Sequence, residues 1–135
     1  MNFLDTNLIV YANDRRDPDK QQRALDVIRR EIRTGTGVVS IQVLQEYANT
    51  ALNKLRQEPA VVLRQLTLLE TLTVVCPESA MVQRTVELKT LYQLSFWDAA
   101  ILAAAESAGC RQVFSEDLNA GQAFGSIRVI NPFAG

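Results

Sequence analysis

The chain has 135 residues, a formal net charge of 14 − 15 = −1, 47% hydrophobic residues and 21% charged residues. This length fits one domain over residues 1–135, and so much apolar surface excludes a wholly disordered chain. The sequence contains no histidine, which excludes Ser-His-Asp and Cys-His nucleophilic sites and histidine-bound zinc. Any chemistry must therefore use carboxylates, hydroxyls, amines or a bound metal ion.

Short apolar runs rich in β-branched or aromatic residues predict strands, and the longer segments between them have the spacing and terminal residues of helices. In chain order we expect a strand over 2–4, a helix over 18–33, a strand over 38–40, helices over 41–55 and 59–71, a strand over 73–75, helices over 79–94 and 96–108, and strands over 112–114 and 127–130. Strands that alternate with helices favour right-handed βαβ crossovers. The predicted fold is an α/β class, three-layer α/β/α sandwich with a central parallel sheet of about five short strands.

Two of the predicted helices have informative patterns. Over 41–55, an apolar stripe at helical spacing predicts packing on the sheet or a neighbouring helix. The stripe consists of Leu44, Tyr47, Ala48, Ala51, Leu52 and Leu55. The segment 96–108 is rich in alanine, which permits close packing, and Gly109 after it suits a left-handed cap. We therefore expect this last helix to lie at the centre of the fold.

Cysteine usage and the N-terminal segment bear on the compartment. Cys76 and Cys110 have no CxxC spacing, which argues against a zinc site and a disulfide framework, so we expect both to be small buried side chains in a reducing compartment. The N-terminal segment has no basic region of a signal peptide, and no apolar run approaches the ~18 residues of a membrane span. We predict a cytoplasmic protein without membrane contact.

Four acidic residues fall near the predicted carboxyl ends of strands, where ligands gather in open parallel sheets. Asp5 directly follows the first strand, and Asp117 comes three residues after the strand over 112–114. Glu46 lies in the second turn of the helix that follows the strand over 38–40, and Asp98 opens the alanine-rich helix. The four carboxylates are expected to meet at one edge of the sheet.

Each acid also has a purely structural interpretation. Asp5 suits a helix N-cap, and Asp98 suits a capping box with Ser95. Asp117 suits a turn. Glu46 lies roughly opposite the apolar stripe of its helix, where a solvated glutamate is common.

The set of acids points to a metal ion, because carboxylates that converge repel one another unless a cation neutralises them. Ligation by oxygen alone suits Mg²⁺ or Mn²⁺. Such an ion orients and deprotonates a water and stabilises charge on a phosphoryl group. Hydrolysis of a phosphodiester is the natural reaction.

Five segments carry a resemblance to a known family: LDTN at 4–7, QEYAN at 45–49, SFWDAAILAAAE at 95–106, SEDLNAG at 115–121 and INPF at 130–133. In this order and spacing the chain resembles PIN-domain nucleases, and more narrowly VapC-type toxins of bacterial type II toxin–antitoxin systems. The resemblance covers nearly the whole chain and implies the α/β/α fold already predicted from the pattern of elements.

The resemblance implies roles for six residues. The metal-binding and catalytic acids would be Asp5, Glu46, Asp98 and Asp117, with Asn7 and Ser115 orienting them by hydrogen bonds. Position 119 is Asn, where some members carry another acid, so a second ion would bind weakly or only with RNA. Glu116 is expected to point away from the site.

The resemblance also implies an activity and partners. The reaction would be Mg²⁺- or Mn²⁺-dependent endoribonucleolytic cleavage of a tRNA, rRNA or mRNA, with Asp5 or Asp98 assisting the attacking water. Such proteins usually form homodimers and are inhibited by a cognate antitoxin whose C-terminal segment can place an arginine at the acids.

Basic and aromatic residues offer contacts for such a substrate. Seven of the 14 lysines and arginines lie within the first 33 residues, and most are expected to cover a solvated helix face. Arg15 and Arg16 follow the short apolar turn after Asp5 and are our candidates for RNA contact. Trp97 is expected to be a core or helix-packing aromatic, with stacking on a base as the alternative.

Two other functions remain open. A receiver-like phosphoacceptor domain also has acids at strand ends, but it needs an acid pair after its first strand, where Asp5 is followed by Thr6 and Asn7. It also needs a lysine after its last strand, and all three lysines lie in predicted helices. A catalytically idle PIN-like binding module is the second alternative.

Overall fold

The computed structural model describes residues 1–134, which form one six-stranded sheet and its covering helices. The strands are β1 (Asn2–Leu4), β2 (Gly37–Ser40), β3 (Thr73–Val75), β4 (Gln112–Phe114), β5 (Ala123–Phe124) and β6 (Ile127–Ile130). The helices are α1 (Thr6–Ala12), α2 (Pro18–Thr34), α3 (Ile41–Asn53), α4 (Pro59–Leu69), α5 (Ser79–Tyr92) and α6 (Phe96–Ser107). The strand order is β3-β2-β1-β4-β6-β5.

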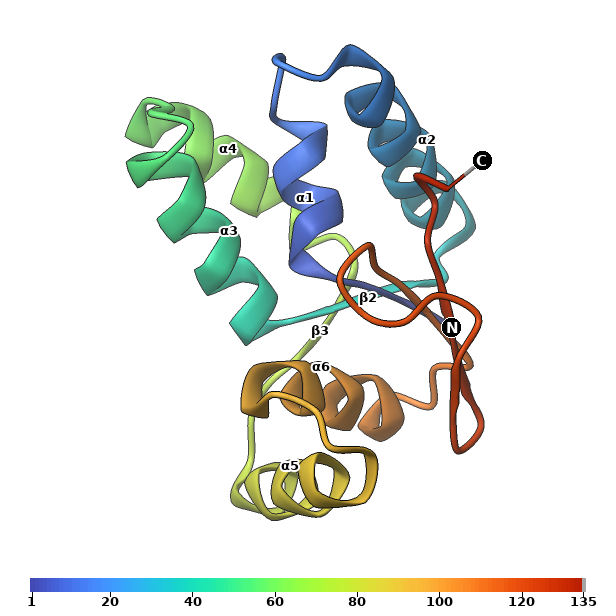
Figure 1. The fold of residues 1–135 in the computed structure, drawn as a ribbon. Coiled ribbons are helices and arrows are strands. Elements are labelled where there is room, and N and C mark those ends of the chain that lie inside the picture. Colours follow the sequence, from blue (N-terminus) through green and yellow to red (C-terminus); the bar gives the residue numbers. More distant parts are fainter. Residues whose placement is uncertain (135) are drawn as a thin grey trace.

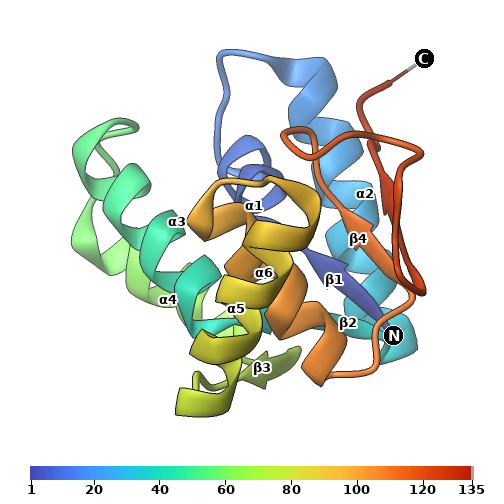
Figure 2. The same cartoon turned by 60° about the horizontal axis from the view of Figure 1, so that its bottom comes forward.

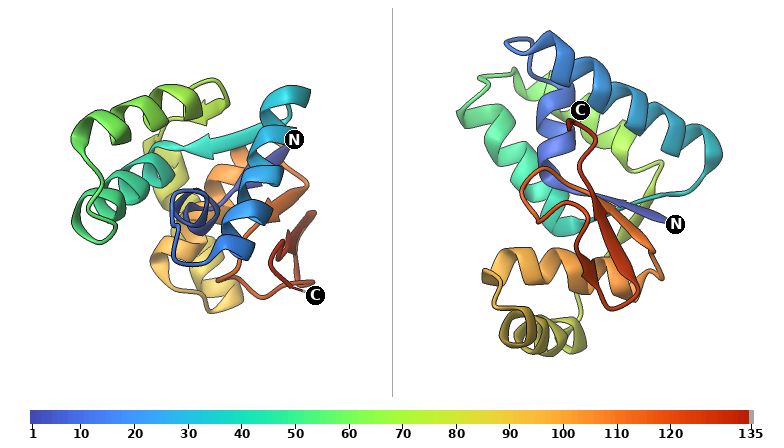
Figure 3. Two further views of the ribbon diagram at one scale, coloured as in Figure 1. Left: turned by 90° about the horizontal axis from the view of Figure 1, so that it is seen from above. Right: turned by 45° about the vertical axis from the view of Figure 1, so that its right-hand side comes forward.

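The elements form three layers, as predicted. Helices α1 to α4 cover one face of the sheet, and α5 and α6 cover the other (Figures 1 and 3). Five strands pair in parallel, while the short β5 pairs antiparallel with β6. Within residues 1–134, no helix has both the length and the apolar character needed to cross a membrane.

The topology places a switch point between β1 and β4. The chain runs from β1 outward through β2 to β3, then crosses the sheet through α5 and α6 and returns on the other side of β1 (Figure 2). In the register, Leu4 at the end of β1 is paired with Phe114 at the end of β4. The residues that follow these two strands therefore emerge side by side at the edge where ligands bind in open parallel sheets.

The alanine-rich helix α6 lies at the centre, as predicted. Its alanines at 99, 103, 104 and 105 are buried, and it packs on α5 and on three strands of the sheet. Gly109 after it has a φ of +70°, the left-handed conformation that a glycine adopts without strain. The small alanine side chains on its buried face permit close packing against these neighbours.

Two elements were missed in the sequence analysis. Helix α1 has only seven residues and begins directly after Asp5, so its apolar run is too short to show a helical period. Strand β5 has two residues and forms a hairpin with β6 through a turn at Gly125, whose φ is +62°. The remaining helices begin where predicted and end one or two residues from the predicted ends.

Three predictions about burial were wrong in part. The buried face of α3 is centred on Val43, Tyr47 and Ala51, while Leu52 is 42% exposed because at about 100° per residue it lies off that face. Cys110 is buried as expected, but Cys76 is exposed in the turn after β3. Trp97 is 64% exposed and is not a core residue, because its ring packs on the neighbouring Phe96 at the mouth of a hollow rather than in the layer between the helices and the sheet.

Candidate active site

The Asp5 side chain lies at the switch point, directly after β1. It is the N-cap of α1 and is only 6% exposed. Its Oδ1 accepts a hydrogen bond from the backbone N–H of Thr6 at 2.7 Å, and its Oδ2 accepts one from the Ser115 hydroxyl at 2.8 Å. The structural and functional interpretations of Asp5 are compatible, because one oxygen caps the helix and the other faces the end of β4.

Burial raises the pKa of Asp5 from its ordinary 3.8 to about 6. Desolvation is the main cause, and the nearby carboxylates of Asp117 and Glu46 raise the pKa further. The hydrogen bonds from Ser115 and Thr6 act in the opposite direction and offset only part of this rise. The site therefore holds a buried carboxyl whose ionised form is disfavoured by burial, and a positive charge nearby would stabilise that form.

Ser115 and Asn7 connect Asp5 to Asp117. The Ser115 hydroxyl donates to Asp5 and accepts hydrogen bonds from the backbone N–H groups of Asp117 and Leu118, at 3.1 and 3.3 Å. The Asn7 amide donates to Asp117 Oδ2 at 3.1 Å. Asp117 thus sits in the turn predicted for it, and Asn7 and Ser115 lie where a supporting role requires them.

Glu46 approaches from α3 and is tied to the same edge by two neighbours that the sequence analysis missed. The Thr6 hydroxyl donates to Glu46 Oε2 at 3.0 Å, and the Gln42 amide donates to Oε1 at 2.6 Å. The signals were present in the sequence, since Thr6 lies between two predicted site residues and Gln42 is one helical turn before Glu46.

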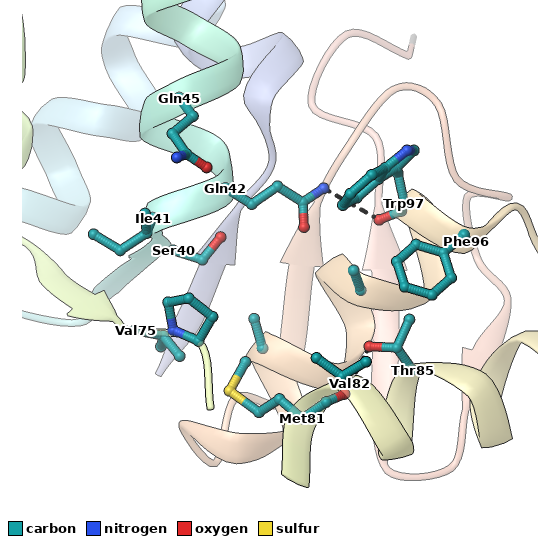
Figure 4. A pocket seen from close by; sticks show the side chains of 13 residues that line it. Ser40, Ile41, Gln42, Gln45, Val75, Met81, Val82, Thr85, Phe96 and Trp97 are labelled. Carbon is teal, nitrogen blue, oxygen red and sulfur yellow. Dashed lines mark hydrogen bonds between the residues drawn. The ribbon is translucent and has the colours of Figure 1, made fainter. Parts of the chain in front are cut away.

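Asp98 lies at the margin of the arrangement. Ser95 caps α6 by accepting a hydrogen bond from the Asp98 N–H at 3.2 Å. The Gln42 side chain that contacts Glu46 also reaches the Trp97 carbonyl oxygen, at 3.4 Å, which links the start of α6 to α3 (Figure 4). Of the four predicted acids, Asp5, Asp117 and Glu46 are linked by hydrogen bonds through their neighbours, whereas Asp98 is connected to them, within residues 1–134, only through the Gln42 bond to the adjacent residue.

The donor set fits a hard cation that keeps much of its water. Among residues 1–134, no three carboxylates stand close enough to form a ready ligand cluster. Within the same residues, no lysine or arginine forms an ion pair with Asp5, Glu46 or Asp117. Mg²⁺ usually binds one or two carboxylates and several waters. Glu46 and Asp117 line a hollow of about 370 Å³ without ion pairs of their own in the described part of the chain, beside Arg16 and Lys54, and fit an ion held largely through its waters.

Of the two candidates for RNA contact, Arg15 and Arg16, only Arg16 lines this hollow. Its Nε and Nη2 atoms bind the two oxygens of Asp14 at 2.9 Å each. Arg15 lines a neighbouring hollow instead. Glu116 lines the acidic hollow too, but its carboxylate pairs with Lys20. The expectation that Glu116 points away from the site was therefore wrong, although its pairing with Lys20 neutralises its charge.

A separate apolar hollow of about 230 Å³ lies between α3, α5 and α6 (Figure 4). Val82 and Met81 of α5 and Phe96 and Trp97 of α6 line it, together with Gln42. The Phe96 and Trp97 rings meet edge to face, with their centroids 5.0 Å apart. The exposed Trp97 is thus part of an open apolar surface that adjoins the acidic site.

Comparison with known proteins identifies a family and a fold. Residues 3–123 match the family model described as PIN domain. A structure described as a toxin–antitoxin complex from Klebsiella pneumoniae has a TM-score of 0.70 and 21% identity, covering 98% of both chains. The Mycobacterium tuberculosis toxin VapC20, described as cleaving the sarcin–ricin loop, has a TM-score of 0.67 and 18% identity, covering 87% of this chain and 92% of its own. No curated protein matches the sequence.

Proposed function

Because the chain belongs to the PIN-domain family, whose members are nucleases, we propose that it is a Mg²⁺- or Mn²⁺-dependent endoribonuclease that hydrolyses RNA phosphodiester bonds in the cytoplasm. The observation that supports this most directly is the buried Asp5 carboxyl at the switch point, linked to Asp117 through Ser115 and lacking a cationic partner within residues 1–134. A receiver domain would belong to another family, so that alternative is dropped.

In this proposal the acids have two roles, which are to hold the ion and to accept a proton. Asp5, Asp117, Glu46 and Asp98 hold the ion, directly or through its waters. When bound, the ion lowers the pKa of a water and offsets charge on the phosphoryl oxygens. Ser115 and Asn7 keep two of the carboxylates in place, and Asp5 or Asp98 takes the proton of the attacking water.

The test is cleavage of total RNA by the purified chain, with the cut sites mapped. Asp5→Asn and Asp98→Asn are expected to abolish cleavage while the far-ultraviolet circular dichroism spectrum stays unchanged, and EDTA is expected to abolish it in the unmodified protein. Full activity in either variant, or in EDTA, would overturn the proposal. Calorimetric titration with Mg²⁺ separates it from an idle binding module, which would bind no ion.

We further propose that the protein is the VapC-type toxin of a toxin–antitoxin pair. The Klebsiella pneumoniae neighbour is described as such a complex, and VapC20 as a toxin that cleaves the sarcin–ricin loop. An acidic site without a cationic partner would accept an arginine from an antitoxin, since guanidinium binds carboxylates bidentately. Expression of the chain should arrest bacterial growth, and co-expression of the reading frame beside its gene should restore growth; a harmless chain would contradict the proposal.

The apolar surface on α5 and α6 supports a homodimer. Val82 and Val86, one turn apart on α5, and Trp97 of α6 are each more than half exposed. Apolar groups gathered in this way commonly mark an interaction surface. Light scattering should give twice the chain mass of 15.0 kDa for the protein, and about the single-chain mass after Val82→Lys with Val86→Lys. A monomeric unmodified protein would contradict the dimer.

A further inference from the structure

The acidic hollow adjoins a second hollow of opposite charge. The two share Asp14, Arg16 and Lys54 as lining residues, and the second, of about 390 Å³, is also lined by Arg15. The first contains Glu46 and Asp117, whereas the second contains no acid except Asp14. The net charge of the lining residues therefore changes from negative in the acidic hollow to positive in the second hollow.

Asp14 holds the Arg16 side chain in place. Asp14 is 8% exposed and accepts three hydrogen bonds from Arg16, one from the backbone N–H at 3.0 Å and two from the guanidinium at 2.9 Å. The Arg16 side chain is nevertheless 65% exposed. A guanidinium has five N–H groups, so three remain available to face the solvent. Asp14 thus fixes the direction of Arg16 without enclosing it.

Lys54 is brought to the same place by contacts between two loops. It is the C-cap of α3. In the turn after it, Gln57 accepts a hydrogen bond from the buried Tyr47 hydroxyl at 3.2 Å and donates to the Asn13 carbonyl oxygen at 3.5 Å. Arg56 in this turn has a φ of 54°, which costs about 1 kcal/mol or more in a residue that is not glycine. The surrounding contacts offset this strain and hold the α3–α4 turn against the α1–α2 turn.

The charges favour a phosphate group. The pairing with Arg16 neutralises Asp14, so Arg15 and Lys54 give the second hollow an excess of positive charge. We propose that Arg15, Arg16 and Lys54 bind the backbone phosphates of the RNA strand next to the phosphate that is cleaved, so that the strand runs from the carboxylates into the basic hollow. This inference rests on the proposed function, because it takes the acidic hollow as the place of cleavage.

The test measures RNA binding rather than cleavage. A fluorescent single-stranded RNA is titrated with Asp5→Asn protein, which keeps the RNA intact, at several salt concentrations. Adding Lys54→Gln should weaken binding several-fold and reduce the slope of log Kd against log salt concentration by about 0.7, the value for one lost contact with a single strand. Lys54→Arg should restore the slope, and Lys89→Gln, at an exposed lysine of α5, should change neither quantity.

Arg16 needs a paired variant, because removing it alone leaves Asp14 unpaired. Asp14→Asn with Arg16→Gln removes both charges and should reduce the slope in the same way, with folding checked by circular dichroism. Unchanged affinity and slope in both the Lys54→Gln and the paired variant would overturn the inference while leaving the nuclease proposal intact. If the unmodified chain binds RNA with the predicted slope changes but cuts none, the nuclease proposal fails and the phosphate contacts stand.

Discussion

The buried carboxyl of Asp5 makes a prediction about stability that is independent of any activity. Asp5→Asn keeps the size of the side chain, and its amide oxygen can accept from the Thr6 N–H. The Ser115 hydroxyl loses the acceptor for its proton, because it already accepts from the N–H groups of Asp117 and Leu118, so the substitution removes the ability to ionise and one hydrogen bond. In metal-free protein the variant should therefore gain stability relative to the unmodified protein as the pH rises to neutrality, although the same change should abolish cleavage.

The pKa of Asp5 sets the size and the direction of the change in stability with pH. Its value is about 6 in the folded chain against an ordinary 3.8, so between these pH values the folded state holds a proton that the unfolded state has lost. Its contribution to stability is then greatest below pH 3.8 and falls as the pH rises through 6. At about 1.4 kcal/mol per pH unit, the whole window amounts to about 3 kcal/mol. For a chain of this length that corresponds to about 10 °C in Tm.

The assay is urea denaturation of both proteins in EDTA between pH 4 and 8, with Asp26→Asn as the matched control. Asp26 is an exposed aspartate of α2, so its substitution should leave the pH dependence unchanged. The difference in stability between the two proteins should shift by about 3 kcal/mol in favour of the Asp5→Asn variant between pH 4 and 7, on top of a constant offset from the lost Ser115 hydrogen bond. Mg²⁺ should restore stability to the unmodified protein by mass action. A constant difference across the pH range would refute the reasoning.

Three further predictions concern the site and the sheet. Ser115→Ala removes the hydroxyl that links Asp5 to the turn after β4, and should lower the free energy of unfolding by about 1–3 kcal/mol and Mg²⁺ affinity by about 10–100-fold, as measured by urea denaturation and calorimetry. Gly37→Ala would place a Cβ 2.7 Å from Leu72 Cδ2, so thermal denaturation should show a loss of about 1–3 kcal/mol. Glu46→Gln removes a charge from an exposed side chain, so stability should change by less than about 0.5 kcal/mol, while the Mg²⁺ concentration for half-maximal cleavage should rise.

Controls distinguish these effects from general damage. Ser126→Ala, at an exposed serine before β6, should alter neither stability nor Mg²⁺ affinity. Unchanged Mg²⁺ affinity in Ser115→Ala would argue against its role in holding the ligands. An unaltered Tm in Gly37→Ala would mean that β2 and its neighbours shift to make room. Loss of folding in Glu46→Gln would show that its bonds to Thr6 and Gln42 are structural.

Much of the fold could be predicted because its information is local. Five strands and five helices were located from short apolar runs, helical spacing and terminal residues, and the alternation of strands with helices predicted the layers. The rule that ligands gather beyond the carboxyl ends of strands then pointed to Asp5 and Asp117, which the structure places together. What local signals missed were α1 and β5, whose seven and two residues are too few to show a period.

The sequence by itself determined the kind of site, because a chain without histidine that places acids after strands offers oxygen ligands there. The tertiary structure decided how those acids are used. Ser115 joins Asp5 to the turn of Asp117 across 110 residues of sequence, and a contact between two turns brings Lys54 to the hollow that Arg16 also lines. Such contacts depend on which faces of distant elements meet, and burial raises the pKa of Asp5 only once they have met. Spacing along the chain encodes neither which distant faces meet nor how deeply Asp5 is buried.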